Sequence, residues 1–137
     1  MTDTATIKAY LAADYRVDGE PGFTMRIGQP CQALAVLYAR EGVNCCAFIS
    51  ACNPQGDAST AHLNDERQAA FARMLDARGL KFIPGAGSDP RGEWQAEPSY
   101  LVLGTSLEQS RAIGRGLDQN AIVWCGPDCV PALILLR

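Results

Sequence analysis

The spacing of hydrophobic residues alternates along the chain between two periods, one typical of helices and the other of strands. Four segments place apolar residues every three or four positions, which predicts amphipathic helices. These predicted helices span residues 5–14, 30–41, 60–78 and 106–117. Gly42 follows the second segment and Gly79 the third, so we expect those two helices to end there.

Between the helical segments lie short runs that are mostly apolar. Such runs predict strands that are buried on both faces of a sheet. They span residues 44–50, 81–85, 99–104, 120–124 and 131–137. Residues 15–28 instead form two alternating runs around a stretch dense in turn residues, Asp18–Gly22, which predicts a β-hairpin.

Strands that alternate with helices indicate a sheet with helices packed on it. The hairpin near the start and the pair of strands at the end favour a mixed sheet. We therefore expect one α/β domain over residues 1–137, with a mixed central sheet and about three to four helices; an α+β arrangement is the alternative. The chain shows no internal repeat or linker, which favours a single domain.

Composition and charge narrow the classes of partner. Hydrophobic residues make up 47% of the chain and charged residues 20%, and the net charge is −3. No basic excess is present to follow a phosphate backbone, so we expect no nucleic-acid partner. No apolar run approaches the roughly 20 residues of a membrane helix, and residues 1–10 lack the pattern of a signal peptide. We therefore expect a cytoplasmic protein with no membrane partner.

Six cysteines are many for 137 residues. In a secreted chain they would suggest disulfides, but nothing in the sequence indicates secretion. Cys125 and Cys129, in CGPDC, are the only two spaced to share a metal, and no second Cys or His pair completes four ligands. Cys45 and Cys46 are adjacent in a predicted strand, so they point to opposite faces. We expect reduced thiols that act as small hydrophobic residues, with no metal and no cofactor.

The predicted helix 60–78 carries a cation among its apolar residues. At about 100° per residue, the core-facing sector holds Leu63, Ala70, Phe71, Met74 and Leu75. Arg67 falls in the middle of this sector and Asn64 beside it. An unpaired buried guanidinium is costly, so Arg67 needs a partner. That partner is either a carboxylate of the protein, in a structural clamp, or an anionic ligand at the helix N-terminus.

Polar residues beside two predicted strands are further candidates for binding a ligand. Asn53 and Pro54 follow the strand 44–50, and α/β proteins bind ligands at the carboxyl ends of strands. Gln119 precedes the strand 120–124, where it either forms part of a turn or contacts a ligand.

The Gly-rich loop before the strand 99–104 contains a carboxylate and an aromatic residue. Pro98 biases Glu97 toward an extended conformation, which places Glu97 at the start of that strand. Trp94 offers either an anchor for the loop or a stacking surface for a ligand ring.

Helix capping explains the residues at the start of the predicted helix 106–117. Thr105 and Glu108 have the spacing of a capping box, at a strand-Gly-helix step that lacks the Lys and the glycine spacing of a phosphate loop.

Cys52 and His62, the only histidine, flank one loop, so their spacing permits a catalytic pair of a nucleophile and a base. We expect His62 away from the Arg67 face of its helix, which disfavours a catalytic dyad.

The order of these motifs resembles the bacterial domain-of-unknown-function family 3293. The resemblance covers roughly residues 10–125 and is carried by AFISACNP, NDER, PGAGSDPRGEW, EPSYLVLG and QNAIV. It implies one shared constellation of residues, namely Asn53, Pro54, Asn64, Arg67, Glu97 and Gln119. It implies no activity, since none is established for the family. The family often has another residue at the position of Cys52, which argues against Cys52 as a nucleophile.

Three functions are compatible with these residues. We expect a cleft that binds a small polar or anionic molecule, for example a nucleotide-like one, lined by Asn53, Asn64, Arg67, Trp94, Glu97 and Gln119. The first alternative is a hydrolase- or transferase-type enzyme with Glu97 as general base and Arg67 stabilising negative charge. The second is a non-catalytic interaction module whose polar cluster is structural. The sequence leaves the oligomeric state open.

Overall fold

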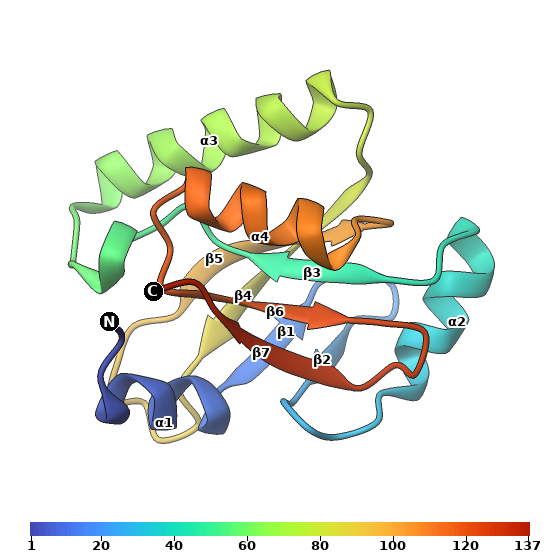
Figure 1. The fold of residues 1–137 in the computed structure, drawn as a ribbon, viewed down its shortest axis with the longest axis horizontal. Coiled ribbons are helices and arrows are strands. Elements are labelled where there is room, and N and C mark those ends of the chain that lie inside the picture. Colours follow the sequence, from blue (N-terminus) through green and yellow to red (C-terminus); the bar gives the residue numbers. More distant parts are fainter.

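The computed structural model describes the whole chain, residues 1–137, as four helices and one short 3-10 turn around seven strands (Figure 1). The helices are α1 (Thr4–Ala12), α2 (Gln32–Glu41), α3 (Ala61–Ala77) and α4 (Leu107–Gly116). The strands are β1 (Asp14–Val17), β2 (Phe23–Met25), β3 (Cys46–Ile49), β4 (Phe82–Ser88), β5 (Glu97–Leu103), β6 (Ala121–Cys125) and β7 (Pro131–Leu135). The 3-10 turn, η1 (Pro54–Gly56), follows β3.

All seven strands belong to one sheet, in the order β2-β1-β4-β5-β3-β6-β7. The six central elements, β3-α3-β4-β5-α4-β6, place their strands in the order β4-β5-β3-β6. This is the split βαβ topology of ferredoxin-like folds. β1 and β2 extend the sheet at one edge, and β7 extends it at the other.

The α/β class, the single domain and the four helices are as predicted, but every pair of neighbouring strands is antiparallel rather than mixed. Each helical connection, through α3 or α4, returns the chain to a strand that runs in the same direction. These parallel strands are not neighbours in the sheet. β5 lies between β3 and β4, β3 lies between β5 and β6, and each intervening strand runs the opposite way. The hydrophobic pattern reports burial on both faces of a strand, and burial does not specify the direction of the neighbours.

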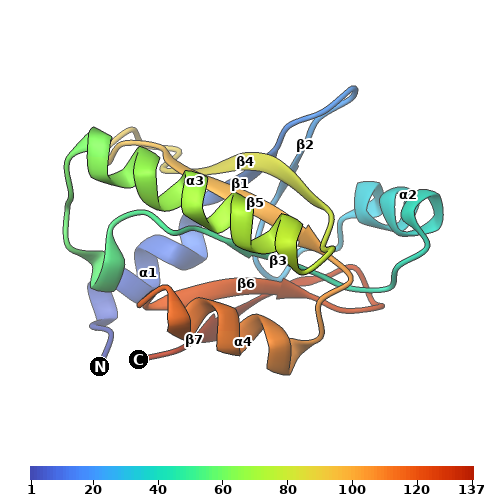
Figure 2. The ribbon, with the colours of Figure 1, turned by 90° about the horizontal axis from the view of Figure 1, so that it is seen from above.

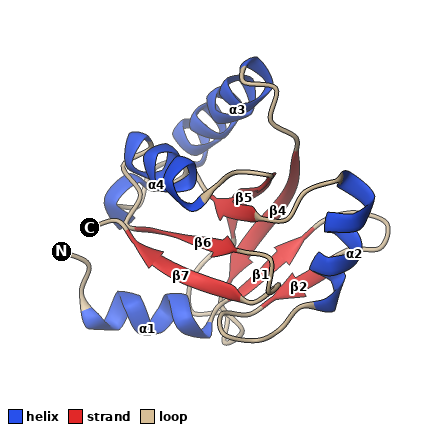
Figure 3. Ribbon diagram, turned by 45° about the vertical axis from the view of Figure 1, so that its right-hand side comes forward, coloured by secondary structure: helices blue, strands red, loops and turns tan.

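Two hydrophobic clusters, one on each face of the sheet, use alternate residues of the central strands. Along β3, Ala47 and Ile49 face α3 and α4, whereas Cys46 and Phe48 face the opposite side. α3 and α4 lie together over the first face (Figures 2 and 3). The second face is covered by α2, which contributes the fully buried Leu34, and by the curl of β1 and β2.

The first turn of α4 is closed by a capping box one residue later than predicted. Ser106 Oγ accepts a hydrogen bond from the backbone N–H of Gln109 at 3.2 Å, and Gln109 Oε1 accepts one from the N–H of Ser106 at 3.0 Å. The predicted box of Thr105 and Glu108 is therefore wrong, because Thr105 is fully buried and contacts the Ser110 hydroxyl instead.

The two ends of the chain meet on one side of the molecule (Figure 1). The backbone N–H of Thr2 donates to the carbonyl of Arg137 over 3.2 Å. None of the helices combines the length and the apolar character needed to cross a bilayer.

Candidate functional site

The end of β3 and the start of β5 bring polar residues together on the side of the molecule where the termini meet (Figure 1). β3 and β5 are antiparallel neighbours, so the segment that follows β3 lies beside the first residues of β5. The Ser50 hydroxyl donates to the Pro98 carbonyl over 2.8 Å and joins the two segments. This pairing places Asn53 next to Glu97.

The side chain of Asn53 connects three segments. Its Oδ1 accepts hydrogen bonds from the backbone N–H of Ser59 at 3.0 Å and from Asn64 Nδ2 at 2.9 Å. Its Nδ2 donates to Glu97 Oε2 at 3.0 Å. Arg67 completes the group through contacts with Ser59 and Asn64. We call these five residues, Asn53, Ser59, Asn64, Arg67 and Glu97, the Asn53 cluster.

Arg67 lies partly buried at the edge of the Asn53 cluster. Its Nη1 donates to Ser59 Oγ at 2.7 Å and more weakly to Asn64 Oδ1 at 3.5 Å. No carboxylate lies within ion-pair distance of the guanidinium, and Nε and Nη2 donate to no protein atom. Arg67 and Glu97 therefore belong to one hydrogen-bonded chain, Arg67–Asn64–Asn53–Glu97, without forming an ion pair.

The buried face of α3 differs from the predicted sector at one margin. Phe71 and Leu75 are buried as expected, but Leu63 is 43% exposed and Ala70 is also exposed. Gln68 is also buried on this face, although it lies outside the predicted sector. The sheet contacts α3 along the row that contains Asn64, Gln68, Phe71 and Leu75, which follows the usual three- and four-residue steps of a helix.

Gln68 is a site residue that the sequence analysis missed. Its Oε1 accepts a hydrogen bond from the backbone N–H of Ala51 at 2.8 Å, just beyond the end of β3. Its Nε2 is the one buried side-chain nitrogen or oxygen of the chain without a hydrogen-bond partner. A polar residue four positions after Asn64 was the signal that could have identified it.

Glu97 is partly buried at the start of β5. Burial raises the pKa of its carboxyl group, and the hydrogen bond from Asn53 opposes this rise. No Lys or Arg side chain pairs with Glu97 to neutralise it. The site therefore holds an acidic group that keeps its proton to a higher pH than an exposed glutamate does.

Two tyrosines that the sequence analysis missed lie within electrostatic range of Glu97, and one of them contacts Asn120. Burial raises the pKa of Tyr10 and Tyr15, and the charge of Glu97 adds to the rise in both. Tyr15 Oη donates to the Tyr10 carbonyl at 2.6 Å, and Asn120 Nδ2 donates to Tyr10 Oη at 3.4 Å. These residues lie on α1, on β1 and before β6, so only the fold brings them together.

Two further predicted residues, Gln119 and Trp94, make no hydrogen bond to the Asn53 cluster. Gln119 is buried, and its Nε2 donates to the carbonyl of Cys52 at 3.0 Å and to that of Leu117 at 3.4 Å. Gln119 thus ties the start of β6 to the end of β3. Trp94 is 36% exposed and makes no hydrogen bond to the Asn53 cluster.

Left-handed backbone conformations concentrate beside the cluster. Asn53, Gln55 and Asp118 all have positive φ, at 46°, 60° and 56°. The N–H of Gln55 donates to the Asp118 carbonyl at 2.6 Å, so the strained residues are in contact. Such strain costs about 1–3 kcal/mol per residue and collects at functional sites.

The spacing that permitted a Cys52–His62 dyad does not bring these residues together as a catalytic pair. His62 is exposed, and its Nε2 pairs with Glu66 Oε1 at 3.1 Å. Cys52 is buried, and this burial raises the pKa of its thiol. No group of three or more His, Cys, Asp or Glu side chains has the geometry to hold a metal ion.

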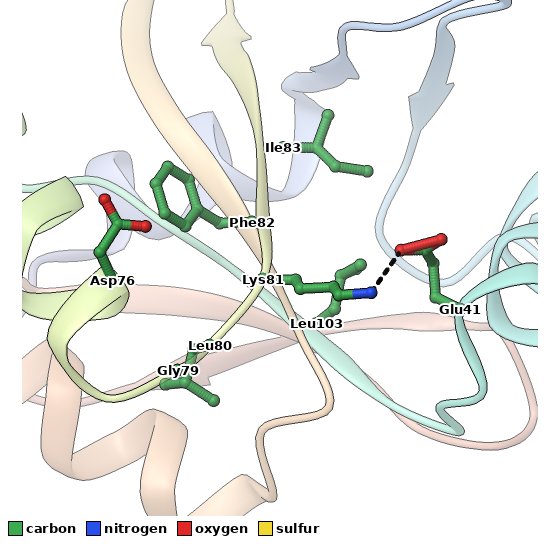
Figure 4. Close-up of a pocket in the computed structure, with 8 residues that line it drawn as sticks. All are labelled: Glu41, Asp76, Gly79, Leu80, Lys81, Phe82, Ile83 and Leu103. Carbon is green, nitrogen blue, oxygen red and sulfur yellow. Dashed lines mark ion pairs between the residues drawn. The ribbon is translucent and has the colours of Figure 1, made fainter.

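The two main hollows of the surface lie away from the Asn53 cluster. The larger, of about 560 Å3, is a shallow depression between the ends of α2 and α3, where Lys81 Nζ lies 3.7 Å from Glu41 Oε1 (Figure 4). Leu80, Phe82 and Ile83 form part of its wall. The smaller hollow follows the β1–β2 hairpin.

Comparison with known proteins extends these observations. Neither the curated proteins nor the solved structures give a match. A family model matches residues 49–122, from the end of β3 into β6, and this range includes the whole Asn53 cluster. Because the match covers more than half of the chain, the chain belongs to the family described as Protein of unknown function (DUF3293).

Proposed function

We propose that this protein binds a small molecule with a carboxylate or phosphate group, and that Arg67 holds the anion. The observation that carries the proposal is the Nε–Nη2 edge of the partly buried Arg67 guanidinium, which has no protein partner. That edge presents two parallel N–H groups, which match two oxygens of a carboxylate or phosphate. An arginine retained only for structure would be expected to meet a carboxylate of the protein.

The surroundings of Arg67 support a prepared binding site. Ser59 and Asn64 hold Nη1, so the guanidinium is oriented before a ligand arrives. On the other side of Asn53, the carboxyl of Glu97 is an acceptor for a hydroxyl or amino group of the same ligand. Nucleotides, sugar phosphates and amino acids all combine an anion with such a donor.

A second function, acid–base catalysis, is favoured by the raised pKa of Glu97, which burial causes. A carboxyl group whose pKa is raised toward neutrality is suited to take a proton from a substrate. In this version Glu97 is the general base, and Arg67 stabilises the negative charge that develops on the substrate.

The test is thermal unfolding of three proteins against a panel of nucleotides, sugar phosphates, amino acids and small organic acids. The proteins are the wild type, Arg67→Ala and the control Arg73→Ala, which removes an exposed cation without an ion pair from the same helix. A ligand at one hundred times its Kd stabilises the folded state by about 2.7 kcal/mol. We expect a bound ligand to raise the melting temperature of the wild type and of Arg73→Ala, and to leave that of Arg67→Ala unchanged.

The second readout is the free energy of unfolding of the variants without ligand. Arg67→Ala should cost about 1 kcal/mol or less, because it removes bonds only to a hydroxyl and an amide. A loss of several kcal/mol, together with no shift from any compound, would show that the Asn53 cluster is structural. For a compound that binds, Glu97→Gln separates the two functions: binding alone survives the change, whereas turnover requires the carboxylate.

A further inference from the structure

Four of the six cysteines gather at the opposite end of β3 and β6 from the Asn53 cluster. Cys46 is the first residue of β3, and Cys125 is the last residue of β6. Cys31 precedes α2, and Cys129 lies in the turn between β6 and β7. All four belong to, or pack against, the same hydrophobic cluster on the α2 side of the sheet.

Cys46 and Cys125 are direct partners in the antiparallel register of β3 and β6. Opposed residues of antiparallel strands have Cα atoms about 4.5–5.5 Å apart, and disulfides span about 4.4–6.8 Å. Both side chains lie on the α2 side of the sheet, in the same hydrophobic cluster. The register therefore gives the two residues a backbone spacing that a disulfide can span.

The environment of the pair favours reaction at Cys46. Tyr38 Oη lies 3.7 Å from Cys46 Sγ. The neighbouring Cys125 thiol lowers the pKa of the Cys46 thiol, Tyr38 acts in the same direction, and burial opposes both. The thiolate is the nucleophile in disulfide exchange, so a lowered pKa raises the reactive fraction of Cys46.

Cys129 connects this buried pair with solvent. Cys46 and Cys125 are both 0% exposed, whereas Cys31 and Cys129 are partly exposed. The N–H of Cys31 donates to the Cys129 carbonyl at 2.9 Å and holds the two outer cysteines beside each other. The N–H of Cys129 donates to the Gly126 carbonyl at 3.1 Å, so a tight turn joins Cys125 to Cys129.

We propose that Cys46 and Cys125 form a reversible disulfide across β3 and β6, and that small disulfides such as oxidised glutathione oxidise them through Cys129. Cys129 attacks the small disulfide, forms a mixed disulfide and releases one small thiol. Cys125 then attacks the Cys129 sulfur and releases the second small thiol. Finally Cys46 attacks the Cys125 sulfur and returns Cys129 to its thiol. Two protein thiols are oxidised, and one small disulfide is reduced to two thiols.

The test treats the reduced full-length chain with oxidised glutathione under native conditions, traps it with acid and alkylates the remaining thiols. We expect a mass lower by two hydrogens before alkylation and a peptide pair that joins Cys46 to Cys125, both reversed by dithiothreitol. Glutathione adducts alone, a bond between Cys31 and Cys129, or no reaction of the folded chain would each overturn the proposal.

Three variants sharpen the result. Cys46→Ala should lose the linked peptide pair, whereas the matched control Cys45→Ala should keep it, because the Cys45 thiol donates to the Thr105 carbonyl on the other face. Cys129→Ala should slow formation of the bond and leave its final yield unchanged, and an unchanged rate would overturn entry through Cys129. If Cys46→Ala does not fold, the peptide map of the wild type still decides.

Discussion

Asn53 and Glu97 show how single residues combine structural and chemical demands. Asn53 takes a left-handed backbone conformation and uses its side-chain amide to join the loop after β3, the first turns of α3 and the start of β5. Glu97 accepts one of these hydrogen bonds while it is partly buried without a neutralising cation. The left-handed backbone of Asn53 and the partial burial of the Glu97 carboxyl both cost free energy. The effect of each on the stability of the protein can be measured with separate substitutions.

At Asn53, two substitutions distinguish the hydrogen bonds from the backbone strain. Asn53→Ala removes three side-chain hydrogen bonds and leaves their partners unpaired, so we expect a loss of about 2–4 kcal/mol in the free energy of unfolding. Asn53→Gly removes the same bonds but accommodates the positive φ, so it should be less destabilising by about 1 kcal/mol. Urea unfolding of both variants measures the difference, and equal losses would show that the left-handed conformation carries no strain.

At Glu97, the prediction concerns pH. Burial raises the pKa of the folded-state carboxyl above its ordinary value of 4.5, so the folded state binds this proton more tightly than the unfolded state does. The associated stability is fully present below about pH 4.5 and is lost as the pH rises through the raised pKa. Glu97→Gln keeps an acceptor for Asn53 and does not titrate, so it should gain stability relative to the wild type over this interval.

The measurement is the free energy of unfolding of both proteins at a series of pH values from about 4 to about 8, which brackets the range for a raised carboxyl pKa. A difference between wild type and Glu97→Gln that stays constant with pH would contradict the burial of an uncompensated carboxyl group.

At the scale of elements, α4 illustrates how one glycine sets the distance between a helix and the sheet. A Cβ atom at Gly114 would lie 2.5 Å from Leu136 Cδ1 and 2.8 Å from Ile122 Cγ2, so only hydrogen fits there. Gly116, at the end of the same helix, has nothing within 4 Å of that position. Leu136 and Ile122 are therefore the two side chains that require a glycine at this position.

These two glycines form a matched pair of substitutions. Gly114→Ala should destabilise the protein by about 1–3 kcal/mol, because the added methyl group overpacks the contact with β6. Gly116→Ala should be neutral or should stabilise the protein by up to about 1 kcal/mol, because alanine favours the helix and meets no neighbour. Thermal or urea unfolding compares them, and equal effects would show that α4 does not approach the sheet this closely.

At the scale of the whole molecule, β3 and β5 supply both hydrophobic clusters. Their alternate residues point to opposite faces, so the α3–α4 layer and the α2 layer rest on the same two strands. Loss of either layer exposes one face of both strands. We therefore expect the two clusters to unfold together as one cooperative unit.

Truncation of one buried leucine on each face tests this cooperativity. Leu75 on α3 and Leu34 on α2 are both 0% exposed. Leu75→Ala and Leu34→Ala should each cost about 2–5 kcal/mol. Circular dichroism and tryptophan fluorescence should follow the same single urea transition in each variant. Separate transitions by the two probes would show that the faces unfold independently.

The local periodicity of hydrophobic residues predicted the positions of most helices and strands. The helix predicted over residues 60–78 appears as Ala61–Ala77, and the strand predicted over 44–50 appears as Cys46–Ile49. Helical and strand periods report which side of a segment is buried, and this information is local. The predicted loop between β4 and β5 was too long at its start, because β4 continues past Gly85 to Ser88 through Gly87, and glycine usually disfavours strands.

The sequence by itself determined the α/β class, the approximate positions of the elements and four of the five residues of the Asn53 cluster, all except Ser59. The tertiary structure alone decided that β5 lies between β3 and β4, that Asn53 and Asn64 separate Arg67 from Glu97, and that Cys46 opposes Cys125. The physical reason is that burial periodicity depends on near neighbours, whereas strand order, direction and register depend on contacts between residues far apart in the chain.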